Sequence, residues 1–97
     1  MIKVEFLPAA REEILAVAER YDAETPRLGE VFLTEVERAV ERITAFPVHG
    51  SPYLADTRRV LLRRFPFSVV YVANSDVALV IAVAHHSRRP GYWRKRL

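Results

Sequence analysis

Hydrophobic residues alternate with charged residues at the start of the chain and then recur at helical spacing. The alternation from Ile2 to Leu7 is the period of a half-buried strand. Apolar positions at three- and four-residue steps follow from Ala9 to about Asp22, and they predict a helix with one buried stripe. A second stripe begins at Thr25-Pro26, a cap residue followed by proline at the first helical position, and ends at Phe46. We expect the two helices to form an antiparallel hairpin.

The second half of the chain has the pattern of short strands joined by tight connections. Residues 48–57 predict a loop because they combine Gly, Ser and Pro. Three predicted strands follow, at Arg58–Phe65, Ser68–Asn74 and Val77–His85, and their short connections favour an antiparallel meander. The predicted fold class is α+β: an N-terminal strand, an antiparallel helical hairpin on one face of a sheet, and a three-stranded antiparallel meander.

The last predicted strand is apolar on both faces from Val77 to Ala84. One face should meet the helices, and something must cover the other. A folded-back loop and tail would do so, and so would the docked helix or strand of a partner protein.

Length and composition predict a single domain over residues 1–97. A chain of 97 residues with 51% hydrophobic and 28% charged residues can bury one core. It has no cysteine, which excludes disulfides and thiolate zinc sites and fits a reducing compartment. The start lacks the pattern of a signal peptide, and the longest apolar run is too short to cross a membrane. We therefore predict a soluble cytoplasmic protein without membrane attachment.

Charge is segregated along the chain. Residues 1–50 carry six Lys and Arg against ten Asp and Glu, a balance of −4, whereas residues 51–97 carry nine against two, a balance of +7. Thirteen of the fifteen cationic residues are Arg, whose planar fork suits phosphate and carboxylate. The basic half favours nucleic acid or an acidic protein as partner, although acidic helices and basic strands on a solvated surface would give the same balance.

The segment after the last strand gathers the candidate chemistry. His86 with Tyr92 is the sharpest catalytic pair, because imidazole titrates near neutral pH. The alternative is that His85 and His86 simply cap the strand end. Tyr92 and Trp93 could stack on bases, and for Trp93 we favour packing of the tail against the domain. The arginines that either bind phosphate or carboxylate groups or protect a strand edge from aggregation are Arg58, Arg59, Arg63, Arg64, Arg88 and Arg89.

The acidic side chains of the helices receive no chemical role. Most lie opposite the apolar stripes and are expected on solvated helix faces, including Glu12, Glu13, Glu35, Glu37 and Glu41. We predict no metal site and no cofactor, because adjacent strand histidines point apart and the basic half offers few acidic ligands.

The order of elements, residues 62–71 (LRRFPFSVVY) and residues 85–93 (HHSRRPGYW) resemble the RelE/ParE family of type II toxins. The resemblance covers essentially the whole chain. It implies a toxin of the plasmid-stabilisation kind, neutralised by a cognate antitoxin in a hetero-oligomer. RelE-like members of the family cleave messenger RNA on the ribosome, and ParE-like members poison DNA gyrase.

The ribonuclease branch works without a metal and uses four kinds of residue: basic residues on the first meander strand, an arginine that clamps phosphate, a cation after the last strand and a C-terminal tyrosine. This chain keeps two of the four. Arg59 is the counterpart of the basic residues on the first meander strand, with Arg63 further along, and Tyr92 takes the place of the C-terminal tyrosine. Ser68 replaces an arginine that clamps phosphate, and His86 falls where the family has a cation after the last strand. The catalytic set of a nuclease would therefore be His86, Tyr92 and Arg59.

We therefore expect ParE-like inhibition of DNA gyrase ahead of RelE-like, ribosome-dependent cleavage of mRNA. The chain is an enzyme, an endoribonuclease, only under the second reading. A non-toxic, antitoxin-bound regulatory module is the third alternative.

Overall fold

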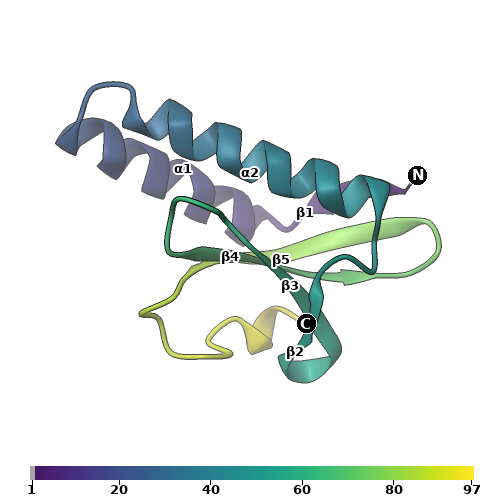
Figure 1. Cartoon of the computed structure of the whole chain (residues 1–97). Coiled ribbons are helices and arrows are strands. Elements are labelled where there is room, and N and C mark those ends of the chain that lie inside the picture. Colours follow the sequence, from purple (N-terminus) through teal and green to yellow (C-terminus); the bar gives the residue numbers. More distant parts are fainter. Residues whose placement is uncertain (1) are drawn as a thin grey trace.

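A five-stranded sheet separates a helical hairpin from the C-terminal segment (Figure 1). The structure is a computed structural model that describes residues 2–97. Its elements are β1 (Lys3–Phe6), α1 (Pro8–Glu24), α2 (Leu28–Ala45), β2 (Ser51–Tyr53), the 3-10 turn η1 (Leu54–Asp56), β3 (Thr57–Leu61), β4 (Phe67–Ala73), β5 (Val77–His85) and the 3-10 turn η2 (Arg94–Arg96). Within these residues, no helix combines the length and apolar character needed to span a membrane.

The strand order is β1-β5-β4-β3-β2. The predicted antiparallel meander is present as β3, β4 and β5, and the α+β fold class is confirmed. The N-terminal strand β1 joins this meander by pairing in parallel with β5, from Lys3 opposite Val77 to Phe6 opposite Val80. The helical hairpin connects β1 to the rest of the sheet and lies across one face (Figure 1).

The predicted loop at residues 48–57 is wrong in part, because it contains β2 and η1. Strand β2 is only three residues long and has Pro52 at its centre, so no alternating pattern reveals it. A proline is tolerated there because β2 is an edge strand, paired with β3 alone from Ser51 opposite Arg59 to Tyr53 opposite Thr57. The next strand is also shorter than predicted and ends at Leu61.

The second helix begins at Leu28 rather than at Thr25-Pro26. Thr25 instead ends α1, where its backbone N–H donates to the carbonyl of Tyr21 at 2.9 Å. The N-terminal turn of α2 is satisfied from the preceding helix, since the Asp22 carboxylate accepts the Gly29 N–H at 2.7 Å. A Cβ at Gly29 would lie 2.3 Å from the carbonyl oxygen of Ala18, so the close approach of the two helices requires glycine.

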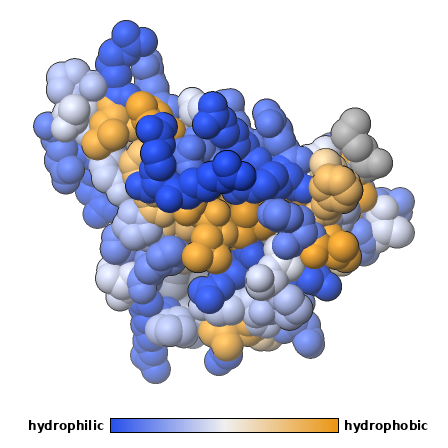
Figure 2. Space-filling view, viewed as in Figure 1, coloured by the Kyte–Doolittle hydropathy of each residue, from blue (hydrophilic) through white to orange (hydrophobic). Residues whose placement is uncertain are grey.

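The helices bury the larger hydrophobic core against the sheet. An aromatic cluster lies at its centre, with Phe32 of α2 at 5.4 Å from Phe65 and 5.2 Å from Phe67 between ring centroids. Tyr21 of α1 packs on Phe65 at 5.1 Å. Hydrophilic residues cover much of the outer side of the helices, and hydrophobic residues show as a band beneath them (Figure 2). The amphipathic stripes predicted from the sequence therefore face this core.

A β-bulge in β5 gives the sheet a second apolar face. Val70 pairs with Ala82 but Tyr71 pairs with Val80, so Ile81 is an extra residue between these pairs. As a result, Val80 and Val83 both belong to the core under the helices. Ile81 and Ala82 belong to a smaller buried cluster with Val70 and Trp93. The second apolar face of β5 is therefore covered by the chain's own tail, with Tyr53 and Leu54 packed beside it.

Candidate functional site

The tail, residues 86–97, folds back across the sheet and is held there by Trp93. The indole is 1% exposed and belongs to the cluster of Val70, Ile81 and Ala82. The ring of Tyr53 packs against it with centroids 6.1 Å apart. This is the packing role considered for Trp93, and the buried indole has no free face for stacking on a base.

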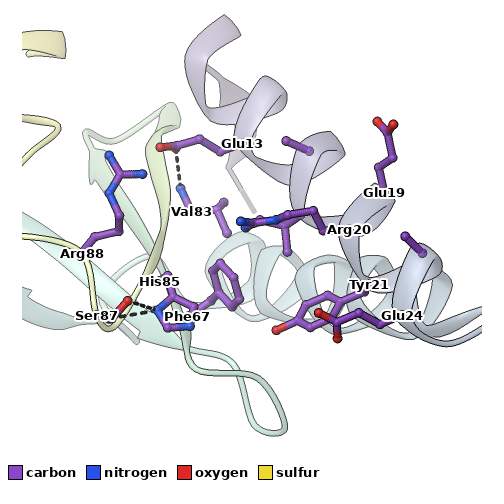
Figure 3. Close-up of a pocket in the computed structure, with 13 residues that line it drawn as sticks. Glu13, Glu19, Arg20, Tyr21, Glu24, Phe67, Val83, His85, Ser87 and Arg88 are labelled. Atoms are coloured by element: carbon purple, nitrogen blue, oxygen red, sulfur yellow. Dashed lines mark hydrogen bonds between the residues drawn. The ribbon is translucent and has the colours of Figure 1, made fainter.

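Glu13 of α1 is the hydrogen-bonding centre that fixes the tail. Its carboxylate accepts both terminal nitrogens of Arg96, at 2.8 and 3.0 Å, and also accepts the hydroxyl of Tyr92. It further accepts the backbone N–H of Val83 at 3.1 Å, a contact drawn in Figure 3. The expectation that Glu13 lies on a solvated helix face is therefore wrong.

Glu13 and Arg96 together complete the edge of β5 where β1 stops. The last pair of that parallel ladder joins Phe6 to Val80. Beyond it, the Val83 N–H donates to Glu13, and the Ile81 carbonyl accepts from Arg96 at 3.0 Å. The ion pair thus supplies one acceptor and one donor to backbone groups that a longer β1 would have paired.

The Tyr92 hydroxyl is held in its neutral form. Burial raises the pKa of Tyr92 well above its ordinary value, and the hydrogen bond to the Glu13 carboxylate raises that pKa further. Arg88 and Arg96 oppose the shift, and Arg88 lies with its guanidinium carbon 3.9 Å from the centre of the Tyr92 ring. A phenol in this position donates its proton to Glu13 and does not ionise near neutral pH.

The three residues predicted as a nuclease set do line one small pocket, here called the tail pocket. It has a volume of about 130 Å³. Its polar lining comes from Tyr53, Arg59, Ser68, His86, Arg89 and Tyr92, among others. The structure therefore brings Arg59, His86 and Tyr92 together.

Each of these three side chains already has a partner within the chain. His86 Nε2 lies 2.9 Å from the hydroxyl of Ser68, a residue only 3% exposed. The guanidinium carbon of Arg59 lies 4.2 Å from the centre of the Tyr53 ring. Because Tyr92 is bonded to Glu13, all three side chains of the predicted nuclease set are engaged in contacts within the protein.

His85 and Ser87 cap the end of β5. The Nδ1 atom of His85 accepts the backbone N–H of Ser87 at 2.9 Å and lies 2.7 Å from its hydroxyl oxygen. The ring of His85 also packs edge-on against Phe67 at 5.0 Å. Both residues border a larger, open groove of about 840 Å³ between α1 and the strand ends (Figure 3).

The remaining candidate arginines have different environments. Arg58 donates to the carbonyl of Gly50 at 2.8 Å and so holds a loop in place. Arg63 and Arg64 are exposed in the connection between β3 and β4. Arg88 lies over the Tyr92 ring, and Arg88 and Arg89 both line the tail pocket.

Glu35 is the second acidic residue that departs from its predicted solvated position. It is 5% exposed and accepts the backbone N–H of Arg63 at 3.2 Å, with Arg38 at 3.7 Å. Helical spacing could have revealed both the buried Glu35 and the partly buried Glu13. Glu13 lies three residues after the buried Ala10, and Glu35 lies three residues after the buried Phe32. Arg96, close to the C-terminus, carries no comparable signal.

Residues 2–97 contain no group of three or more His, Cys, Asp or Glu side chains positioned to hold a metal ion. The arrangement presents cationic and aromatic groups on one side of the sheet, where Glu13, Tyr92 and Arg96 are bonded to one another and both histidines are bonded to serines.

Comparison with known proteins identifies relatives of this fold. The family model described as ParE toxin of type II toxin-antitoxin system, parDE, matches residues 4–90. A solved structure described as the chromosomal ParDE TA system from P. aeruginosa superposes with a TM-score of 0.76 at 15% sequence identity. The superposition covers 88% of this chain and 96% of that one. No curated protein sequence gives a significant match.

Proposed function

The chain belongs to the ParE toxin family of type II toxin-antitoxin systems, and on that premise we propose that it inhibits DNA gyrase without cleaving nucleic acid. Membership of this family implies an antitoxin partner. The choice of target is supported by the state of Tyr92, whose hydroxyl is bonded to Glu13 and whose pKa is raised.

A metal-independent nuclease needs a base, an acid and cations placed around the scissile phosphate. Here the phenol of Tyr92 is committed to a carboxylate, and the imidazole of His86 is committed to Ser68. The position of an expected phosphate clamp is occupied by the buried Ser68 itself. These contacts leave little free acid or base at the tail pocket and favour a toxin that acts by binding.

Two assays on the purified full-length protein separate the targets. We expect inhibition of gyrase supercoiling and no cleavage of mRNA on translating ribosomes. Induced expression should arrest growth. If growth is unaffected and neither assay responds, the chain is a non-toxic module and the gyrase proposal fails.

One observation favours the ribonuclease as a second candidate, namely that Arg59, His86 and Tyr92 border the same pocket. Tyr92→Phe and His86→Ala test this directly, with the exposed Arg94→Gln as matched control. Under the gyrase proposal both pocket variants keep their toxicity once their folding is verified. Cleavage of mRNA that is lost in Tyr92→Phe and retained in Arg94→Gln would establish the nuclease instead.

We also propose that the chain forms a hetero-oligomer with its antitoxin in the cytoplasm. The +7 balance of residues 51–97 supports an acidic partner segment. The tail already covers the second apolar face of β5, so the partner would contact the outside of the tail or another surface. Co-expression with the product of the neighbouring gene, followed by light scattering of the purified complex, would give its mass; a chain that stays alone would refute the assignment.

A further inference from the structure

A second cationic cavity, here called the basic cleft, lies where α2, the loop after it and β3 meet. Its volume is about 330 Å³. The polar residues that line it are Arg42, His49, Ser51, Arg59 and Arg63. None of the five carries a carboxylate. Arg42 and Arg63 bring positive charge to the cleft, whereas the guanidinium of Arg59 lies over the ring of Tyr53.

Arg42 brings an unused hydrogen-bond donor to this cleft. Its Nε atom is buried and has no hydrogen-bond partner. Every other buried side-chain nitrogen or oxygen among residues 2–97 has one. A buried donor without an acceptor is costly, more so on a charged group. An anion in the cleft would supply the missing acceptor if the Arg42 side chain turned this nitrogen toward it.

The loop that borders the basic cleft is held rigidly. The buried hydroxyl of Tyr71 donates to the carbonyl of Pro47 at 2.7 Å and accepts the N–H of Gly50 at 3.0 Å. Arg58 donates to the carbonyl of Gly50 from the other side. Glycine is required at this point, since a Cβ on Gly50 would lie 2.6 Å from the Tyr71 hydroxyl. The neighbouring His49 is therefore positioned before any ligand arrives.

The acidic residue on the same side of α2 does not neutralise the cleft. Glu35 lies two turns before Arg42 and already accepts the N–H of Arg63, with Arg38 as its ionic partner. Its charge is thus shared with groups that are bonded to it, and the side chains lining the cleft keep an excess of positive charge.

We propose that the basic cleft binds a phosphate group, either as the free ion or within a polynucleotide. The guanidiniums of Arg42 and Arg63, with the imidazole of His49, match the multiple oxygens and charge of phosphate, whereas a single carboxylate is satisfied by one arginine. The cavity has room for on the order of ten water molecules, at ~30 Å³ each, and so accommodates a phosphate with an attached group. The cleft shares Arg59 with the tail pocket, but it contains none of the contacts of Tyr92, and the proposal does not depend on gyrase being the target.

The proposal is tested by NMR on the ¹⁵N-labelled full-length protein, through the side-chain Nε–Hε signal of Arg42. Inorganic phosphate should shift this signal in a saturable way, whereas chloride at the same ionic strength should not. A decamer of thymidylate tests the polynucleotide source. Tighter binding of the decamer, with the same shift, assigns the site to a polynucleotide; a shift with phosphate alone assigns it to the free ion.

Variants then locate the binding. Arg42→Gln and Arg63→Gln should weaken phosphate binding at least tenfold, and the exposed Arg94→Gln should change it less than twofold. An equal loss in all three variants, a shift without saturation, or a shift caused by an oligoglutamate peptide but not by phosphate or the decamer would overturn the proposal. If a variant does not fold, the titration of the unaltered protein still decides the question.

Discussion

The two faces of the sheet are closed by different kinds of interaction. Under the helices, two long amphipathic elements bury a continuous apolar core with Phe32 and the other aromatic rings at its centre. On the opposite face, four residues form the buried cluster, and the indole of Trp93 is its largest side chain. The tail is also held on this face by the hydrogen bonds of Glu13 with Tyr92 and Arg96. We therefore expect the helix face to provide most of the stability, whereas the tail face holds the polar groups of the candidate site.

The largest effect is expected from breaking the helix face. Phe32→Ala should lower the free energy of unfolding by about 3–5 kcal/mol, because a fully buried ring would be replaced by a cavity. Urea denaturation measures this change. Leu15→Ala on the same hairpin is the control and should cost no more than about 0.5 kcal/mol, since Leu15 is 63% exposed. Equal losses in both variants would contradict the proposed division between the faces.

Breaking the tail face should cost less and act locally. We expect Trp93→Ala to lower the free energy of unfolding by about 2–3 kcal/mol, below the usual range for a buried tryptophan, because the tail can detach while the helix face stays packed. Hydrogen exchange should show lost protection in η2 and retained protection in β4. Trp93→Phe, which keeps an aromatic ring, should restore part of the loss. Uniform loss of protection across the sheet would show that the two faces unfold as one unit.

Removing the charge of Glu13 should have a smaller effect. Glu13→Gln keeps one acceptor for Val83 or Tyr92 but loses the ionic pair with Arg96, and we expect a loss of about 1–2 kcal/mol. Urea denaturation of this variant beside Glu12→Gln, which alters an exposed acid, separates the pair from general charge effects. If both variants are equally stable, the Glu13–Arg96 pair contributes nothing to closing the tail face.

The smallest effect at neutral pH is expected from titration of Tyr92, which becomes visible only in alkali. The raised pKa of this phenol means that its contribution to stability is complete below about pH 10, the ordinary value, and is lost as the pH rises through the folded value. Stability measured from pH 8 to pH 11.5 should therefore fall less steeply in Tyr92→Phe than in the unaltered protein. Parallel curves would mean that Tyr92 titrates as an ordinary tyrosine.

The sequence carried enough information for the fold and less for the site. The stripes of both helices and the full extent of β5 follow from hydrophobic spacing, because each of these elements buries one or two faces. Strand β2 was missed because three residues around a proline have no periodicity. The start of α2 was misplaced because its cap comes from Asp22 of the preceding helix and not from Thr25.

The contacts of the candidate site depend on residues far apart in the chain. The sequence placed Arg59, His86 and Tyr92 in one functional group, and they do share the tail pocket. It could not show that Tyr92 is bonded to Glu13, since these residues are 79 positions apart. No local pattern encodes that contact, although the helical spacing from Ala10 to Glu13 places this acid beside the core.

The same long separations bear on how the chain is completed during its synthesis. Glu13 emerges 70 residues before Val83 and 83 residues before Arg96, its two partners near the C-terminus. At ordinary elongation speeds this delay is roughly 4 to 16 s. For most of that interval β1 lacks its parallel partner, because β5 begins only at Val77. A member of a toxin family built this way cannot reach its finished shape until Arg96 has been added.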